Sequence, residues 1–285
     1  MKATDFLAKI QNVPKRVLVY APPKAGKTAA VFGLARLGYK IVYIGLENGH
    51  LVVANPDLKL SAEDYDRIEI YNIPDSDTNL VAYSAVRQVF QGRRFALCQT
   101  HGANSCKICQ PNAKLPLENP MVIDPSQWDS KTIVVLDSIT QLFISIKLGV
   151  LADVNVGGRM TQQGWGDVGN QMDTIVSRMQ QAPYHLVVLT HTQRIEDTAP
   201  DAKGKPVVVG VRHQPIAGSQ NYSANFPKGF DMVVFMEKQK GRYNAYSDPN
   251  VNPNVLVGSR SKPFIANDWK LEATPLVNIF PKLKD

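Results

Sequence analysis

The sequence is poor in cysteine and contains no long apolar segment. All three cysteines fall between Cys98 and Cys109. An odd, clustered set does not form the disulfide framework of a small secreted protein, so we expect a reduced, intracellular setting. No apolar run approaches the ~20 residues that a membrane helix needs, and the first residues form no apolar signal-peptide core. We therefore expect a cytoplasmic protein with no membrane partner.

Composition excludes several other classes of protein. The chain has 285 residues, of which 44% are hydrophobic and 20% are charged, and its 19 glycines and 19 prolines follow no period. These values exclude a wholly disordered, collagen-like or low-complexity chain and leave enough apolar surface for a sizeable core. The formal net charge of +7 favours polyanionic partners such as nucleic acid without identifying one.

Short apolar segments alternate with helical patterns along the chain. The predicted strands are residues 16–21, 40–45, 67–71, 132–136, 186–189, 231–236 and 255–257, and the predicted helices are residues 26–37, 78–89 and 162–181. This alternation predicts a three-layer α/β fold with a mainly parallel sheet. About fifteen residues precede the first strand, so we expect no separate N-terminal domain. Residues 195–230 are polar and contain glycine and proline, which predicts a mobile loop.

A phosphate-binding pattern follows the first predicted strand. It reads Ala21-Pro-Pro-Lys-Ala-Gly-Lys-Thr28, with alanine where the pattern usually begins with glycine. In such a loop the backbone N–H groups surround a phosphate, the lysine reaches the β- and γ-phosphates and the hydroxyl ligates Mg²⁺. The residues expected to bind ATP and Mg²⁺ here are Pro23, Lys24, Ala25, Gly26, Lys27 and Thr28. The strand at 132–136 ends in Asp137, a carboxylate placed as in a Walker B motif that holds the Mg²⁺ shell.

The cysteines lie in the one long aperiodic segment, residues 92–131. Cys98, His101, Cys106 and Cys109 have the spacing C-x2-H-x4-C-x2-C, which suits tetrahedral Zn²⁺. A structural Zn²⁺ would explain how this segment folds without a core of its own. The alternative is three unrelated reduced thiols. We therefore predict an ATPase core of residues 1–91 and 132–285 that carries a small zinc-binding insertion at 92–131.

Several short motifs together resemble the RecA recombinase core. They are Ala21–Thr28, Glu47, Ile133–Ser138, His191–Arg194, Arg260–Phe264 and the Trp-Gly stretch of Met160–Asp167. The chain looks most like the short phage-encoded RecA-core recombinases, which act as single-strand annealing or recombination-assisting ATPases. The likeness spans most of residues 14–266, and it implies a RecA-like P-loop NTPase fold and the cytoplasm of a phage-infected bacterium.

The resemblance also implies roles for individual residues. Glu47 would activate the attacking water, and either His191 or Gln193 would sense the γ-phosphate and couple it to a DNA loop. Arg260 and Lys262, one residue apart on a late strand, would reach the ATP of a neighbouring subunit. Such fingers supplied in trans stabilise transition-state charge, so hydrolysis would require an assembled oligomer. The alternative for this pair is a solvated basic pair.

Two segments correspond to the DNA loops of a RecA-like core. The first would lie at about 149–162 and contains Arg159, and the second, 203–228, contains basic and aromatic residues but no acid. Cations track a nucleic-acid backbone and aromatic rings stack on bases, a combination that suits single strands. The predicted DNA-binding residues are Arg159, Lys203, Lys205, Arg212, Tyr222, Phe226 and Lys228.

The sequence thus favours an ATP-dependent recombinase that binds single-stranded DNA and promotes annealing or strand exchange. We expect a homo-oligomer, a filament or a ring, and a single-strand-binding protein is a further candidate partner. Three alternatives stay open: a hexameric helicase-like or packaging motor, a small-molecule phosphotransferase that uses the same loop, and a mediator with a vestigial ATPase. The intact set Lys27, Thr28, Glu47 and Asp137 argues against the last alternative.

Overall fold

The computed structural model describes residues 13–76, 80–98, 117, 120–154, 159–201 and 203–283. Their strands are β1 (Arg16–Ala21), β2 (Lys40–Gly45), β3 (Ile68–Asn72), β4 (Phe95–Cys98), β5 (Pro120–Ile123), β6 (Thr132–Asp137), β7 (His185–Pro200), β8 (Pro206–Pro215), β9 (Met232–Gln239), β10 (Arg242–Tyr246), β11 (Gly258–Ser259) and β12 (Ile265–Trp269). The α-helices are α2 (Lys27–Phe32), α3 (Ala62–Asp66), α4 (Ala82–Phe90), α5 (Ile139–Val154), α6 (Gln162–Gln181) and α7 (Gln220–Asn225). Among the described residues, no helix is long and apolar enough to span a bilayer.

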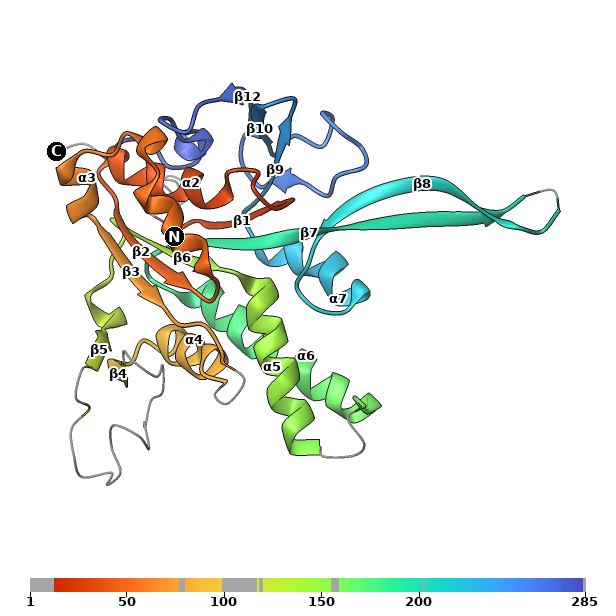
Figure 1. The fold of residues 1–285 in the computed structure, drawn as a ribbon, viewed down its shortest axis with the longest axis horizontal. Helices are drawn as coiled ribbons and strands as arrows, with labels where there is room; N and C mark the ends of the chain where they lie inside the picture. The colour runs from red at the N-terminus through yellow and green to blue at the C-terminus, as the bar shows by residue number, and fades with distance from the viewer. Residues whose placement is uncertain are drawn as a thin grey trace, which may run out of the picture.

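One large sheet forms the middle of the molecule (Figure 1). In the described part of the chain it has ten strands, with the order β12-β10-β9-β1-β7-β6-β2-β3 along its main path. Along this path every pair from β9-β1 to β2-β3 is parallel. The pairs β12-β10 and β10-β9 are antiparallel. The prediction of a mixed α/β fold with a mainly parallel sheet is therefore confirmed.

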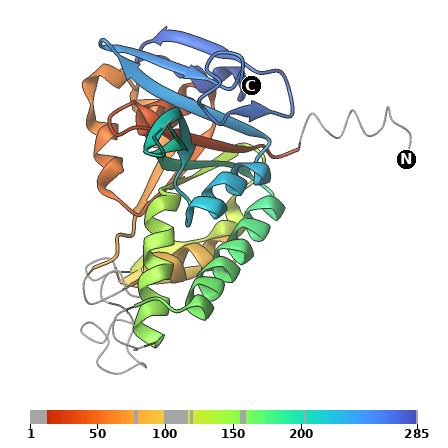
Figure 2. The same cartoon turned by 90° about the vertical axis from the view of Figure 1, so that its right-hand side faces the viewer.

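The alternating side chains of the central strands form two cores, one on each face of the sheet. In β1, Leu18 and Tyr20 point into the core covered by α4, α5 and α6, whereas Val17 and Val19 point into the core covered by α2. This alternation follows from the two-residue period of a strand. Figure 2 shows the resulting layers, with α4, α5 and α6 below the sheet. Because both faces are covered, the inner strands consist of near-continuous apolar residues, which is why most of them could be predicted.

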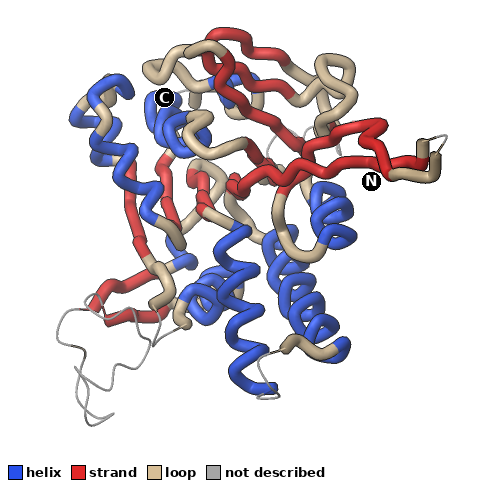
Figure 3. The backbone as a smooth tube through the Cα atoms, turned by 45° about the vertical axis from the view of Figure 1, so that its right-hand side comes forward, coloured by secondary structure: helices blue, strands red, loops and turns tan. Residues whose placement is uncertain are grey.

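The β7–β8 hairpin is a departure from the predicted fold. β7 continues eleven residues beyond the predicted strand end at Leu189, and its outer part pairs with β8 from Thr192↔Pro215 to Pro200↔Pro206. The hairpin projects from the body as an arm in Figures 1 and 3. The expectation of a loop over 195–230 is wrong for much of this segment, because β7 extends to Pro200 and pairs with β8, and α7 follows.

Other boundaries also differ from the predicted ones. The helix after the phosphate loop is α-helical only to Phe32 and continues as a 3₁₀ helix over Gly33–Leu37. The unpredicted α5 is helical through Val154, so the first expected DNA loop, 149–162, is helical in its first part. The strand expected at 255–257 is reduced to a single bridge between His213 and Val255. β4 and β5 form a separate two-stranded sheet at the ends of the expected insertion.

Candidate active site

The phosphate loop connects β1 to α2. Two of its residues, Lys24 and Gly26, have positive φ angles of 61° and 85°. A Cβ atom on Gly26 would lie 3.1 Å from ring atoms of Trp269, so both the conformation and the close packing require glycine. The Nζ atom of Lys27 lies over the loop and donates to the carbonyl of Ala21 at 3.1 Å. The loop therefore has the turn-and-lysine geometry of a phosphate site.

Asp137 lies at the end of β6, beside this loop. Its Oδ2 atom accepts hydrogen bonds from the Thr28 hydroxyl at 3.0 Å and from the Tyr43 hydroxyl at 2.5 Å. Burial raises the pKa of the Asp137 carboxyl, and the charge of Glu47 adds to this effect, while the bonds from Tyr43 and Thr28 oppose it. The Walker B carboxylate and the loop hydroxyl predicted from the sequence are thus in direct contact.

These two residues fit a magnesium ion. Thr28 and Asp137 offer hard oxygen donors next to the phosphate loop, and Mg²⁺ is usually held by one or two such groups together with phosphates and water. When bound, Mg²⁺ would neutralise charge on the β- and γ-phosphates. The described residues contain no group of three or more His, Cys, Asp and Glu side chains that could hold a metal by themselves.

Glu47 follows β2 and faces the same end of the sheet. One carboxylate oxygen accepts a hydrogen bond from the Ser138 hydroxyl, and the other lies 3.2 Å from His191 Nε2. The bond with His191 lowers the pKa of Glu47, against the effect of burial, and Ser138 contributes in the same direction. Burial lowers the pKa of Lys27, and the charges of Asp137 and Glu47 oppose that shift. Glu47 is thus ionised and oriented near the loop lysine, as a general base would be.

The structure distinguishes the two candidate γ-phosphate sensors by position. His191 pairs with Ala21 across the β1–β7 ladder and contacts Glu47. Gln193 lies two residues further along, where β7 pairs with Gln214 of β8, and its Nε2 atom is buried without a partner in the described residues. Of the two, only His191 contacts the predicted catalytic carboxylate.

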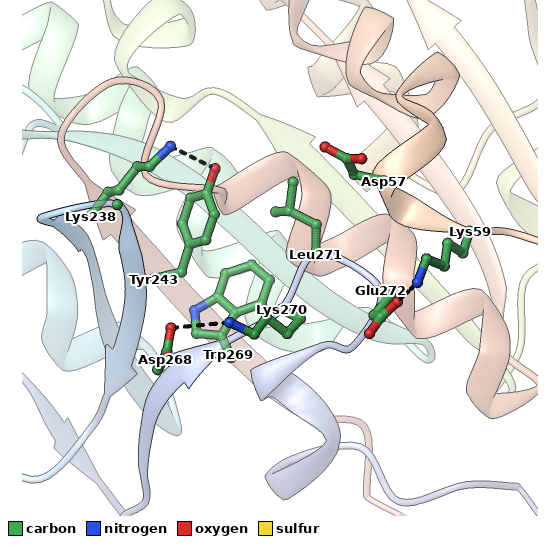
Figure 4. A pocket seen from close by; sticks show the side chains of 10 residues that line it. Asp57, Lys59, Lys238, Tyr243, Asp268, Trp269, Lys270, Leu271 and Glu272 are labelled. Atoms are coloured by element: carbon green, nitrogen blue, oxygen red, sulfur yellow. Dashed lines mark hydrogen bonds and ion pairs between the residues drawn. The ribbon is translucent and has the colours of Figure 1, made fainter.

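A pocket lies beside β10 and β12, whose residues Tyr243 and Trp269 also pack against the phosphate loop. It has a volume of about 410 Å³, and Figure 4 shows its lining. The rings of Tyr243 and Trp269 lie 5.2 Å apart, and both approach Gly26. The Nζ atom of Lys238 lies 4.7 Å from the centre of the Tyr243 ring. The Trp269 side chain is only 7% exposed, and most of the lining is charged: Asp57, Lys59, Lys238, Asp268, Lys270 and Glu272.

Arg260 lies far from the phosphate loop of its own chain. Arg260 and Lys262 follow the two-residue strand β11 and are exposed in a loop, so the expectation that they lie on a strand is wrong. Arg260 contacts Asp231, which also accepts a hydrogen bond from the backbone of Arg16. Arg16 begins β1, whereas the phosphate loop follows its other end, about 17 Å away for a strand of six residues.

The predicted DNA-binding residues do not form one surface. Arg159 lies shortly before α6, whereas Lys203 and Lys205 lie between β7 and β8, at the tip of the arm. Arg212 is paired with Asp197 of β7 at 3.3 Å. Residues 203–228 contain no acid, but the neighbouring strand β7 supplies an acidic partner for Arg212. Lys203 and Lys205 are exposed, and within the described residues neither side chain forms an ion pair.

The aromatic and basic residues after the arm also have other partners. Phe226 is 5% exposed and packs between Tyr222 and Phe230, so it cannot stack on a base in this structure. The Tyr222 hydroxyl donates to Asp173 on α6 at 2.8 Å. Lys228 donates to Asn225 at 2.6 Å. The side chain of Phe226 therefore stabilises the body of the protein.

The predicted zinc site lies mostly outside the described residues. Cys98 is buried at the end of β4. His101, Cys106 and Cys109 fall outside the described part of the chain. The zinc-binding insertion therefore stays a prediction.

Three residues of the site were not found by sequence reasoning. Tyr43 contacts Asp137, Gly49 lies against both of them, and Trp269 packs on the phosphate loop. Tyr43 occurs inside an apolar strand and Trp269 lies more than 240 residues after Gly26, so neither belongs to a local motif. Only the register of the sheet brings them to the site.

Comparison with known families gives one match. The model of a family described as AAA domain matches residues 13–255, which include β1, the phosphate loop, β6 and the arm. Comparison with curated proteins finds no match. The family match covers most of the chain and agrees with the nucleotide-site geometry described above, and it indicates a P-loop ATPase type of protein. The chain belongs to this AAA-domain family.

Proposed function

We propose that the protein is an ATPase that is stimulated by single-stranded DNA and promotes strand annealing or exchange. The observation that carries the proposal is the contact between Glu47 and His191. His191 lies where β7 leaves the sheet and continues into the arm. The predicted water-activating carboxylate is thereby joined through one side chain to the segment that presents Lys203 and Lys205 to solvent.

The chain's own residues would divide the chemistry among them. The loop from Pro23 to Thr28 binds the phosphates, and the Lys27 amine contacts them. Thr28 and Asp137 hold the Mg²⁺ shell, as their contact supports. Glu47 orients the attacking water and accepts its proton, and the hydrogen bond from His191, which lowers its pKa, keeps it ionised. The adenine base would lie against the exposed part of Tyr243, whose ring packs on Gly26 of the loop.

DNA binding would act on hydrolysis through the arm. A single strand held by Lys203 and Lys205 would fix the orientation of β7 and, through His191, that of Glu47. Basic groups that contact phosphates supply affinity without base specificity. This route accounts for stimulation by DNA with no contact between DNA and nucleotide.

The proposal includes an oligomer. Arg260 lies at the opposite end of β1 from the phosphate loop, so it can serve as a finger only for the nucleotide of another copy. Its side chain and that of Lys262 are exposed, which such a role requires. A filament and a ring both satisfy this condition. Zn²⁺ in the insertion and a single-strand-binding protein as a partner remain part of the proposal.

The deciding experiment is ATP hydrolysis by the purified protein with and without single-stranded DNA, with Glu47→Gln as the variant. We expect strong stimulation by DNA in the natural protein and a loss of hydrolysis of roughly 10²- to 10⁴-fold in the variant. Nucleotide binding should persist in the variant, because Lys27 and Thr28 are intact. A rate that does not respond to DNA would contradict the recombinase proposal and favour the phosphotransferase, and unwinding with a direction would favour the motor.

A further inference from the structure

Tyr43 has a polar contact that its position in an apolar strand would not suggest. Its side chain is fully buried in the core between the sheet and α2, with its ring 5.1 Å from that of Phe32. Its hydroxyl donates to Asp137 Oδ2 at 2.5 Å, the same oxygen that accepts from Thr28. A hydrogen bond from a neutral donor to a buried carboxylate is among the stronger ones in proteins.

Sheet register explains how Tyr43 reaches the carboxylate. β2 and β6 are parallel neighbours, with Tyr43 opposite Val135 and Gly45 opposite Asp137. Tyr43 is therefore on the same face as Asp137 but one pleat further back. A phenol ring is long enough to cover that distance along the strand, whereas a leucine or valine at this position would not reach the carboxylate.

Two glycines leave the space that this side chain occupies. A Cβ atom on Gly45 would lie 2.8 Å from Cε1 of the Tyr43 ring. A Cβ atom on Gly49 would lie 2.7 Å from the Tyr43 hydroxyl and 2.6 Å from Asp137 Oδ2. Real Cβ atoms do not approach other heavy atoms this closely, so neither position accepts a side chain without displacing Tyr43 or Asp137.

We propose that Tyr43 is a positioning residue of the magnesium site, whose hydroxyl fixes the Asp137 carboxylate, and that Gly45 and Gly49 are glycines because this arrangement needs the space. The inference deepens the proposed ATPase function and rests on it. With Oδ2 held by Tyr43 and Thr28, the carboxylate has one orientation toward the phosphate loop. Groups that orient a metal-holding carboxylate in this way contribute to metal affinity without touching the metal.

The test is a Mg²⁺ titration of nucleotide binding with Tyr43→Phe, which removes only the hydroxyl. A fluorescent ATP analogue reports binding, so the readout does not depend on hydrolysis. We expect the apparent dissociation constant for Mg²⁺ to rise by roughly 10- to 100-fold. Binding of the analogue in EDTA should be unchanged, because Tyr43 does not touch the phosphate loop lysine.

Tyr39→Phe is the matched control. Tyr39 lies in the same core, is 3% exposed, and donates its hydroxyl to the carbonyl of Pro281 at 3.1 Å, away from the site. The apparent dissociation constant of the Tyr39→Phe variant for Mg²⁺ should stay within about twofold of the value for the natural protein. If Tyr43→Phe and Tyr39→Phe give the same Mg²⁺ constant, the inference is wrong. A purely structural role of Tyr43 would lower the melting temperature and leave the Mg²⁺ dependence as it is.

Gly49→Ala tests the same site independently and decides the matter if Tyr43→Phe does not fold. We expect Gly49→Ala to raise the apparent dissociation constant for Mg²⁺ as well. In the double variant with Tyr43→Phe, the fold-increase should be smaller than the product of the two single fold-increases, because both substitutions act on one carboxylate. Unchanged Mg²⁺ binding in Gly49→Ala contradicts the inference. If the natural protein binds no nucleotide at any Mg²⁺ concentration, the proposed function fails, and if it binds nucleotide with no Mg²⁺ dependence, this inference fails. If it depends on Mg²⁺ and Tyr43→Phe depends on it equally, only this inference fails.

Discussion

β7 is one strand with two halves that differ in what holds them. From Leu186 to Leu189 it lies between β1 and β6, with parallel neighbours on both sides, and these side chains are 0% exposed. From Thr192 to Pro200 it pairs only with β8, and most of its side chains are exposed. The inner half is held by the core and the outer half by the hydrogen bonds of the hairpin. The length of a strand is therefore not set by the extent of the core.

The largest effect is expected at His191, where the two halves meet. His191→Ala removes the contact with Glu47, and we expect DNA-stimulated ATP hydrolysis to fall by roughly 100-fold while single-stranded DNA affinity is retained. The matched control is Thr192→Ala, since Thr192 is the next residue and its hydroxyl donates to the carbonyl of Gln214 at 3.4 Å. Steady-state rates and DNA binding are measured for both variants. Equal rates in the two variants would show that the halves are not coupled through His191.

The next largest effect compares the stability of the halves directly. Leu186→Ala in the inner half leaves a cavity in a closed core and should lower the free energy of unfolding by about 2–5 kcal/mol. Val208→Ala on the arm, where the side chain is 51% exposed, should change it by less than about 0.5 kcal/mol. Urea unfolding measures both. A large loss for Val208→Ala would mean that the arm is packed against another copy under the conditions used.

A pH effect is expected at His185, the first residue of the inner half. Burial lowers the pKa of His185 to about 4, from 6.5 for the free side chain. Between these values the unfolded chain binds more protons than the folded one, so stability falls as the pH falls from 6.5 towards 4. We expect His185 to account for about 1–2 kcal/mol of the loss between pH 7 and pH 5. Unfolding of the natural protein and of His185→Asn at both pH values isolates this contribution, and equal losses in the two proteins would contradict it.

The smallest effect is expected at the arm tip. Replacing both Lys203 and Lys205 by alanine should weaken single-stranded DNA binding about three- to tenfold and reduce the slope of its salt dependence by about 1.4, as the release of counterions from two contacts predicts. Lys131→Ala, an exposed lysine just before β6, is the control. Titrations at several salt concentrations give both quantities. If the slope does not change, DNA does not contact the tip.

The same contrast explains what could be predicted from the sequence. The inner strands were found because burial on both faces produces apolar runs, and the phosphate loop, Asp137 and Glu47 were found because each follows such a run. The arm was missed because no buried face imposes a pattern on it. Its alternation is also broken by a bulge between Asp197 and Thr198, and the valines of β8 face opposite sides.

Residues brought together by register were missed for a different reason. The contact of Tyr43 with Asp137 depends on β2 and β6 being neighbours, which no local pattern states. The packing of Trp269 on Gly26 depends on the antiparallel strands β10 and β12, which were not predicted. The prediction that Phe226 stacks on a base does not agree with its burial. An aromatic residue among basic ones gives the same sequence pattern whether its ring faces solvent or the core.

The arm also has a mechanical consequence. From His191 to Pro200 it spans nine residue steps, or about 30 Å at the rise of an extended strand. A rigid tilt of the arm would have its pivot beside Glu47, which contacts His191. A tilt of about 5° at the pivot carries the tip through about 2.5 Å over that length.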